Sequence, residues 1–206
     1  MSAPMTGVRR TQADRRALSR SALLESAARG LSRFGYGNLV LEQVAKDAGY
    51  SRGALYHQFA TKEELALAVV EWVSETWLDQ MGPLFADTSD PVGALVSIAR
   101  GHAAFCRRDI ARSMMALRVE FSGQGHPIER SVASAGEVIV AGCARLVIAG
   151  RRDGKIPPGP PAKIVAAGLV GALEGIVITL AGKAPYDEVL AERLVLGLLG
   201  DQRAPR

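Results

Sequence analysis

Apolar residues recur every three to four positions along almost the whole chain, and this periodicity constrains the fold more than any other feature. One such stripe consists of Leu24, Ala27, Ala28, Leu31 and Phe34, and it stops at Gly35. A period near 3.6 residues is typical of an amphipathic helix, whereas the alternation expected of strands occurs only in short stretches. The sequence therefore predicts an all-α fold.

Capping and helix-breaking residues divide this pattern into about nine helices. Thr61 and Glu64 have the spacing of a capping box, and Asp90 followed by Pro91 has that of an N-cap and first helical residue. The first expected helix ends at residue 34, and the fourth begins at residue 61. The other expected helices cover residues 41–48, 51–59, 91–107, 110–121, 127–151, 162–181 and 187–199.

Size and cysteine content narrow the class of protein. A chain of 206 residues, 48% hydrophobic and 22% charged, is typical of a soluble globular protein and excludes wholesale disorder. Its two cysteines, Cys106 and Cys143, are too few for a disulfide scaffold and fit a reducing cytoplasm. No apolar stretch follows the arginines of the first 20 residues, so we expect no secretory signal.

The positive charge of the chain is confined to its first third. Residues 1–62 hold 10 Lys and Arg against 4 Asp and Glu, a net charge of +6, whereas residues 63–206 hold 15 against 17, a net charge of −2. Such asymmetry favours a polyanionic partner for the N-terminal part, either nucleic acid or an anionic membrane. A basic end that only aids solubility is the alternative.

Residues 164–182 are long and apolar enough to be tested as a membrane span, and Gly171 and Gly175 have the GxxxG spacing. Against a span, Glu174 lies at its centre, where an ionised carboxylate costs about 2.5–3.5 kcal/mol. Small residues share one helical face: Gly168, Gly171, Gly175, Thr179 and Gly182. Such a stripe allows another helix to approach closely in water too, and we expect a tightly packed helix of a soluble protein with no membrane partner.

Residues 41–62 fit a helix-turn-helix motif. Gly49 supplies the positive φ that the turn requires, and Ala45 is small enough for a close helix crossing. Ser51 caps the second helix, whose exposed face presents Arg52, Gly53, Tyr56 and His57. Because a helix fits the DNA major groove, these side chains are placed to meet base edges or phosphates. Tyr56 has a second interpretation, as a core residue.

About 50 residues, from roughly 20 to 70, resemble the DNA-binding domain of the TetR family of transcriptional regulators. The matching positions are Ala27-Ala28, Gly35-Tyr36, Val44-Ala45, Ala48-Gly49, the run from Ser51 to His57, Phe59 and the run from Lys62 to Leu65. The chain departs from the family pattern at Leu39-Val40, where Thr or Ser is common, and at Tyr50 and Gln58.

The resemblance implies an all-α homodimer on double-stranded DNA with a palindromic operator, in which the last two helices of each chain form the interface. It also implies a small-molecule effector bound in the helical body. The expected organisation is a basic arm over residues 1–15, a DNA-binding domain over 16–62 and a body for effector binding and dimerisation over 63–206. The arginines of the arm, Arg9, Arg10, Arg15 and Arg16, are either a solvated tail or a DNA contact.

Carried over by position, the resemblance assigns DNA contacts to Arg52 for bases or phosphate and to Tyr56 and His57 for phosphates. The full set of expected DNA-binding residues is Ser51, Arg52, Gly53, Tyr56, His57, Lys62 and Lys46. The expected dimer interface consists of Gly168, Gly171, Gly175, Thr179, Leu190 and Leu194.

The body offers a candidate effector pocket, with plain core packing as the alternative. Its residues are Trp72, His102, Phe105, Met114, Arg118 and Phe121. His102 lies on an otherwise apolar helical face and is either a core histidine or a ligand contact. Arg118 needs a partner if it is buried, and Glu120 or an acidic ligand are the candidates.

Nothing in the sequence indicates an enzyme. The histidines and cysteines lack metal-ligand spacing, and no catalytic triad order, P-loop or dinucleotide fingerprint occurs, so we expect neither a metal nor a cofactor. The sequence thus favours a cytoplasmic, ligand-responsive dimeric regulator, most simply a repressor. The alternative is a DNA-tethering architectural or adaptor protein on the same fold, without a small-molecule effector.

Overall fold

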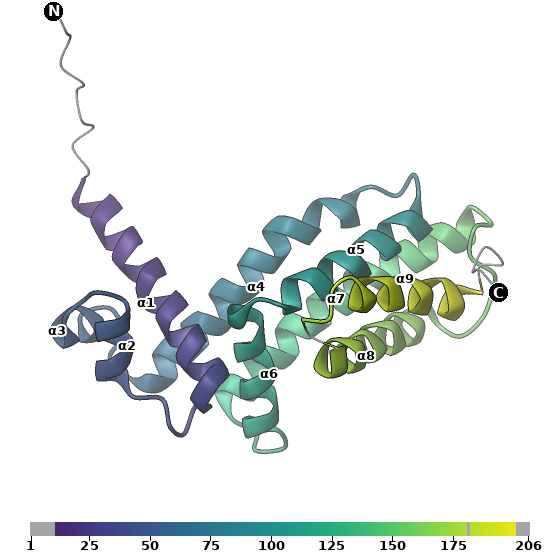
Figure 1. Cartoon of the computed structure of the whole chain (residues 1–206). Coiled ribbons are helices and arrows are strands. Elements are labelled where there is room, and N and C mark those ends of the chain that lie inside the picture. Colours follow the sequence, from purple (N-terminus) through teal and green to yellow (C-terminus); the bar gives the residue numbers. More distant parts are fainter. Residues whose placement is uncertain (1–10, 181, 201–206) are drawn as a thin grey trace, which may run out of the picture.

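The computed structural model describes residues 11–180 and 182–200, and these form nine α-helices and no strand (Figure 1). The helices are α1 (Gln12–Phe34), α2 (Leu41–Asp47), α3 (Arg52–Tyr56), α4 (Lys62–Ala86), α5 (Pro91–Cys106), α6 (Asp109–Phe121), α7 (Pro127–Arg152), α8 (Ala162–Leu180) and α9 (Tyr186–Leu199). The prediction of an all-α fold is confirmed. The largest difference lies in the second helix of the motif, which ends at Tyr56 rather than at Phe59.

Helices α1, α2 and α3 form a small domain whose buried side chains are continuous with the core of the rest of the described chain. Leu23, Leu31, Leu55 and Phe59 are among its fully buried side chains. The buried hydroxyl of Ser26 on α1 donates to the carbonyl of Val44 on α2 at 2.9 Å, which ties the two helices together. The packing of α1 against α4 joins this domain to the rest of the chain.

Helix α4 leads from the small domain into a larger helical body formed with α5, α7, α8 and α9 (Figure 1). Within the body α5 packs against α9, α7 against both α4 and α8, and α8 against α9. An ion-pair network also fixes α9 to the end of α5, because Arg107 donates to the buried carboxylate of Asp187 at 2.6 and 2.9 Å and to Glu188 at 2.6 Å.

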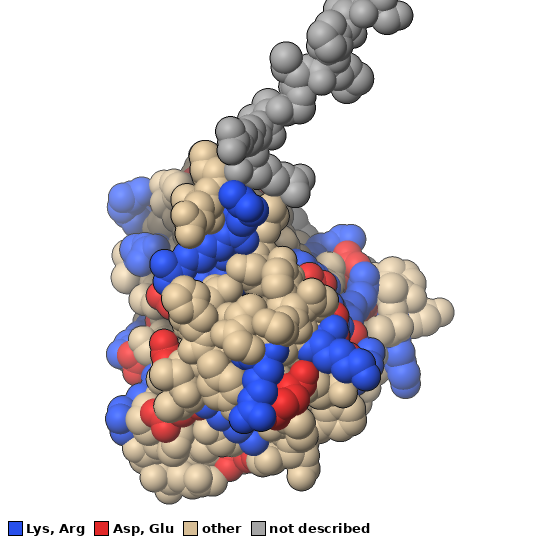
Figure 2. All heavy atoms as spheres, turned by 90° about the vertical axis from the view of Figure 1, so that its left-hand side faces the viewer, with Lys and Arg blue, Asp and Glu red and all other residues tan. Residues whose placement is uncertain are grey.

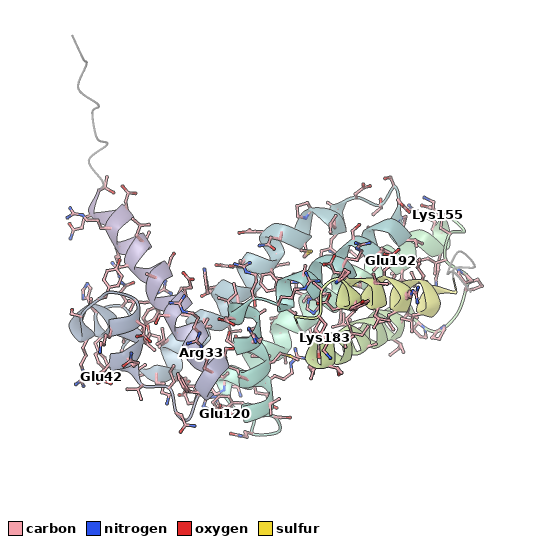
Figure 3. All side chains as sticks on the ribbon, viewed as in Figure 1. Arg33, Glu42, Glu120, Lys155, Lys183 and Glu192 are labelled. Atoms are coloured by element: carbon pink, nitrogen blue, oxygen red, sulfur yellow. The ribbon has the colours of Figure 1, made fainter. Side chains whose placement is uncertain are left out.

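Helix α6 lies at the junction of the two parts, where it packs against α1 on one side and α7 on the other. Its last turn contributes Glu120, which Figure 3 places beside the end of α1 that carries Arg33. The junction therefore has two helical connections, one through α4 and one through α6.

Two details at the N-terminus and in α1 correct the expectations. Helix α1 begins at Gln12, after a capping box between Thr11 and Asp14, so residues 12–15 of the predicted arm are helical. Arg9 and Arg10 lie outside the described residues. Phe34 was expected in the buried stripe of α1, but 58% of its surface is exposed because the helix ends there at Gly35.

Helices α7 and α8 are long and apolar enough to cross a membrane, by length and composition alone. In the fold they pack against each other, and each contributes residues such as Leu146 and Leu173 to the common core. Core helices of soluble proteins share these properties, so the two helices are weak evidence for a membrane protein.

Candidate nucleic-acid interface and body cavity

The turn between α2 and α3 sets the geometry of the helix-turn-helix. Gly49 has φ +78°, in the left-handed region that favours glycine, and the N–H of Tyr50 donates to the carbonyl of Ala45 at 2.9 Å. Leu55 is fully buried beneath α3, and Val44 and Ala45 are buried on α2. This inner packing directs the opposite side of α3 toward solvent.

The outer side of α3 brings together five of the predicted DNA-binding residues, which we call the recognition face. They are Ser51, Arg52, Gly53, Tyr56 and His57, and all five are exposed. The hydroxyl of Ser51 accepts from the N–H of Ala54 at 3.2 Å, which confirms the predicted N-cap. Tyr56 is 40% exposed, so it lies outside the core.

An acidic residue adjoins this face and was missed by the sequence analysis. Glu42, in the first turn of α2, pairs with Nε of Arg52 at 3.1 Å. The guanidinium of Arg52 also lies over the ring of Tyr56, 5.2 Å from its centroid. Glu42 lies at the end of the molecule formed by α1 to α3 (Figure 3), and Figure 2 shows basic and acidic side chains interspersed among neutral ones on this side of the molecule.

The two lysines expected at the DNA differ in their surroundings. Lys46 is exposed on α2. Lys62, at the start of α4, donates from Nζ to the carbonyl of Gly37 at 2.9 Å and lies 4.8 Å from the ring centroid of Tyr36. Its ammonium therefore stabilises the turn between α1 and α2, a partner that sequence spacing did not reveal.

A largely apolar cavity of about 150 Å³, which we call the body cavity, lies between α4, α5, α6, α7 and α8. Of the predicted pocket residues, His102 and Phe105 line it from α5, and Met114 and the charged Arg118 line it from α6. Its other lining side chains are mostly aliphatic or sulfur-containing and include Ile98, Cys106, Ala111, Met115, Val132, Ile139, Cys143, Leu173 and Val177.

His102 is a neutral hydrogen-bonding group inside this cavity. The indole N–H of Trp77 donates to its Nδ1 at 3.1 Å, which leaves the ring proton on Nε2, 3.5 Å from Sγ of Cys106. Burial, reinforced by the charge of Arg118, lowers the pKa of His102 to about 4. Burial also raises the pKa of the Cys106 and Cys143 thiols to about 12, which keeps both protonated.

The partner of Arg118 is Glu174, in the middle of α8. Glu120 and an acidic ligand were the two partners expected from the sequence, and the first of these is wrong because Glu120 points away, toward the α1–α2 turn. The side chains of Arg118 and Glu174 are 40% and 25% exposed, and both line the cavity. The charges of Arg118 and Glu174 at the cavity therefore neutralise each other.

Comparison with known proteins agrees with this geometry. Residues 23–69, which span α2, α3 and the ends of the flanking helices, match the model of the bacterial regulatory proteins of the tetR family. The chain is 42% identical over 71 residues to the HTH-type transcriptional regulator CymR of Pseudomonas putida, a match that covers 34% of this chain and 35% of the relative. The DNA-binding domain is therefore that of the TetR family, and the chain spans about a third of the length of this relative.

Solved structures extend the likeness to the whole TetR-family fold. The fatty acid degradation regulator FadR from Bacillus halodurans superposes with a TM-score of 0.76 at 17% identity, over 90% of this chain and 96% of that one. AibR, solved with isovaleryl coenzyme A and operator DNA, gives 0.70 at 19% identity, over 91% and 100%. At such identities the likeness shows the fold alone.

Two predicted pocket residues of the body lie outside the cavity. Trp72 falls on a different face of α4, and the buried Trp77 takes its place in the lining, because the core-facing stripe of α4 runs through Val69, Val73 and Trp77. Phe121 packs at the domain junction, with its ring 5.0 Å from that of Tyr36 and 4.4 Å from that of His126. The helical periodicity of the sequence indicated that both side chains pack inside the protein, but it did not indicate which neighbouring helices they face.

The junction of the two domains depends on a carboxylate that was expected only as a partner for Arg118. Glu120 accepts the backbone N–H groups of Tyr36 and Gly37, each at 2.6 Å. Arg118, two residues earlier on α6, lines the body cavity. One short helix thus connects the cavity with the DNA-binding domain.

Helices α8 and α9 present an exposed apolar surface, which we call the outer face. Gly168, Gly171, Gly175 and Thr179 are exposed on α8, and a methyl group added at any of these three glycines would meet no atom within 4 Å. Larger apolar side chains surround the stripe: Ile164, Ile178, Tyr186, Val189, Leu190 and Leu198. Leu194, also predicted at the interface, is instead half-buried against the core of its own chain.

Proposed function

We propose that this protein is a homodimeric transcriptional repressor that binds a palindromic operator through α3 and is released when a small apolar molecule occupies the body cavity. One observation carries the proposal. The same chain holds an exposed recognition helix and an apolar cavity with few polar groups, and α4 and α6 join the two. Such cavities are the usual form of small-molecule sites.

In the proposed complex the N-terminal end of α3 enters the major groove. Arg52 contacts a base edge or a phosphate, and the exposed Tyr56 and His57 contact phosphates. Lys46 supplies a further phosphate contact from α2. Arg52 must first leave Glu42, an exposed pair that costs about 0.2–1 kcal/mol to separate.

The outer face of α8 and α9 supports dimerisation with a second copy of the chain. Soluble monomers rarely expose a contiguous apolar surface of this kind, and its glycines permit close backbone approach. A two-fold axis through this face presents two copies of α3 to DNA, which requires an operator with two-fold symmetry. The chain represses where such an operator overlaps a promoter, because the bound dimer excludes polymerase.

The cavity favours an effector whose buried part is uncharged. Arg118 already has Glu174 as its counter-ion, and His102 is neutral over the physiological range. An apolar cavity of about 150 Å³ holds one benzene ring, so the buried part is about that size. The solved complex of AibR with a small molecule and DNA supports an effector for this fold.

Coupling between effector and operator requires an element that differs between the two states. We assign this role to α6, which carries Arg118 at the cavity and Glu120 at the DNA-binding domain. A coupling free energy of about 1–3 kcal/mol would weaken operator binding about 5- to 150-fold.

The test uses fluorescence anisotropy of a labelled DNA fragment that the protein binds. One-ring apolar compounds that raise the melting temperature of the free protein are added to the complex. We expect at least one to weaken DNA binding within this range, with a reciprocal loss of compound affinity in the presence of DNA. DNA binding that no cavity-binding compound changes would favour the architectural alternative.

A further inference from the structure

A hollow on the surface adjoins the body cavity between α4 and α7, and we call it the side hollow. It shares three lining residues with the cavity, Ser74, Ala135 and Val138, so the two spaces meet at these side chains. The remaining lining residues are Arg20, Glu64, Leu67, Ala68, Val70, Glu71, Ser131 and Ser134.

The packing of α4 against α7 determines along which line the side hollow runs. Helices α4 and α7 run side by side in the same sense, because Glu63 pairs with His126 near their starts and Phe85 lies against Gly142 further along. The hollow residues of α4 recur at helical spacing from Glu64 to Ser74. The hollow therefore runs from the mouth of the cavity back toward α1, where Arg20 borders it.

Charge in the hollow is arranged so that a carboxylate lies next to the cavity mouth. Glu71 precedes Ser74 by three residues, which is about 4.5 Å along the helix axis. It has no ion-pair partner within 4 Å in the described part of the chain.

The other charged groups of the hollow are already engaged. Arg20 stacks over the ring of Phe59, 4.7 Å from its centroid, and Glu64 accepts from the N–H of Ala60 at 2.8 Å. The hydroxyls of Ser131 and Ser134 add neutral polar groups on the α7 side. With one basic and two acidic side chains, the hollow favours a cation over an anion.

We propose that the side hollow is a second subsite of the effector site, which binds a protonated amine joined by a chain of about three bonds to an apolar ring in the body cavity. Glu71 is the charge partner of the amine, and the serine hydroxyls replace part of its hydration. This inference rests on the proposed function for the cavity and adds the chemical class of the effector.

Three probes with the same ring and chain length test the inference: phenylpropylamine, phenylpropanol and phenylpropionate. Their affinities for the full chain are measured by titration calorimetry at pH 7. We expect the amine to bind about fivefold more tightly than the alcohol, which is the upper end for a partly exposed charge pair, and the carboxylate to bind most weakly. The preference for the amine falls as salt is added, because screening weakens exposed pairs.

Glu71→Gln is expected to make amine and alcohol bind equally, without changing the affinity for the alcohol. Glu75→Gln makes the same charge change one turn away on the same helix, outside the hollow, and retains the preference. Thermal melting of both variants verifies that they fold.

The outcomes separate this inference from the proposed function. If the alcohol binds as tightly as the amine in the wild type, or Glu71→Gln keeps the preference for the amine, the subsite is wrong while the cavity stands. If none of the probes binds, the inference and the effector role of the cavity both fail.

Discussion

Glu120 in the last turn of α6 accepts a 2.6 Å hydrogen bond from the backbone N–H of Tyr36, a residue 84 positions earlier in the turn after α1. Its other oxygen accepts the N–H of Gly37, also at 2.6 Å. Both N–H groups point at one carboxylate, so the bonds are charge-assisted and position the DNA-binding domain on α6. In the proposed coupling, a shift of α6 at the cavity acts on this turn through Glu120.

Replacing Glu120 with Gln should loosen this connection. The amide keeps only one acceptor oxygen and turns an N–H₂ group toward the second donor, so one of the two bonds is lost. We expect the free energy of unfolding to fall by about 1–2 kcal/mol in urea titrations, and operator binding to become less sensitive to the effector. Glu137→Gln, at an exposed site on α7, is the control, and equal stability of the two variants would reject the connection.

Lys46 and Lys62 should respond differently to substitution. Lys46 is exposed and free to reach a phosphate, so Lys46→Ala should lower the slope of log K against log salt by about one. Lys62 donates to Gly37, so Lys62→Ala should weaken DNA binding through the turn and leave the slope unchanged. Anisotropy titrations over a range of salt concentrations measure both, and a slope reduced by about one for Lys62→Ala would make it a phosphate contact.

His102 should make stability depend on pH between 6.5 and about 4. The unfolded chain takes up a proton near pH 6.5, its ordinary value, whereas burial keeps the folded imidazole neutral down to about pH 4. The stabilisation is therefore complete above pH 6.5 and is lost progressively as the pH falls toward 4. The free energy of unfolding should decrease by about 3 kcal/mol over this interval.

His102→Gln is the matched variant, because its amide oxygen can still accept from Trp77 and does not titrate. The pH dependence of its unfolding should be flatter between pH 6.5 and 4.5. Below that interval the pH dependence of unfolding comes from four carboxylates whose pKa values are held below the ordinary ones by hydrogen bonds: Asp14, Asp87, Glu129 and Asp187. An unchanged slope in His102→Gln would refute the buried neutral histidine.

Gly171→Leu should separate dimerisation from folding. A methyl group added at Gly171 meets no atom within 4 Å in the single chain, so we expect the exposed site to accept leucine, which also removes a glycine from a helix interior. Across a two-fold interface the same side chain is present twice, and overpacking costs about 1–3 kcal/mol. Sedimentation should show a shift toward monomer with helicity retained. Ala133→Leu, exposed on α7, should remain a dimer, and an intact dimer in both would move the interface elsewhere.

The helix-turn-helix was predictable because its determinants are local. Gly49 and Ser51 act within a few residues, through a positive φ and an N-cap, and both have the predicted role. Periodicity also predicted the helices of the body, since the recurrence of apolar residues every three to four positions can be seen in the sequence itself.

Tertiary partners were not predictable in the same way. The choice of Trp77 over Trp72 for the cavity depends on the rotation of α4, and the pairing of Arg118 with Glu174 depends on where α8 packs. The contacts of Glu42 with Arg52 and of Glu120 with the α1–α2 turn were not predicted, because single acidic residues on helices are ordinary surface features until their partners are known. The hydroxyl-free Leu39-Val40 start of α2 did not prevent the helix, whose N-cap lacks a side-chain bond.

The central claim is that two copies of α3 read a symmetric operator, and genomic footprinting with the wild type and Arg52→Ala tests it most directly. We predict protected sites that share an inverted repeat, with half-sites one or more helical turns apart, and a weaker and less selective footprint for the Arg52→Ala variant. Protection without two-fold symmetry, or an unchanged pattern for Arg52→Ala, would contradict the account.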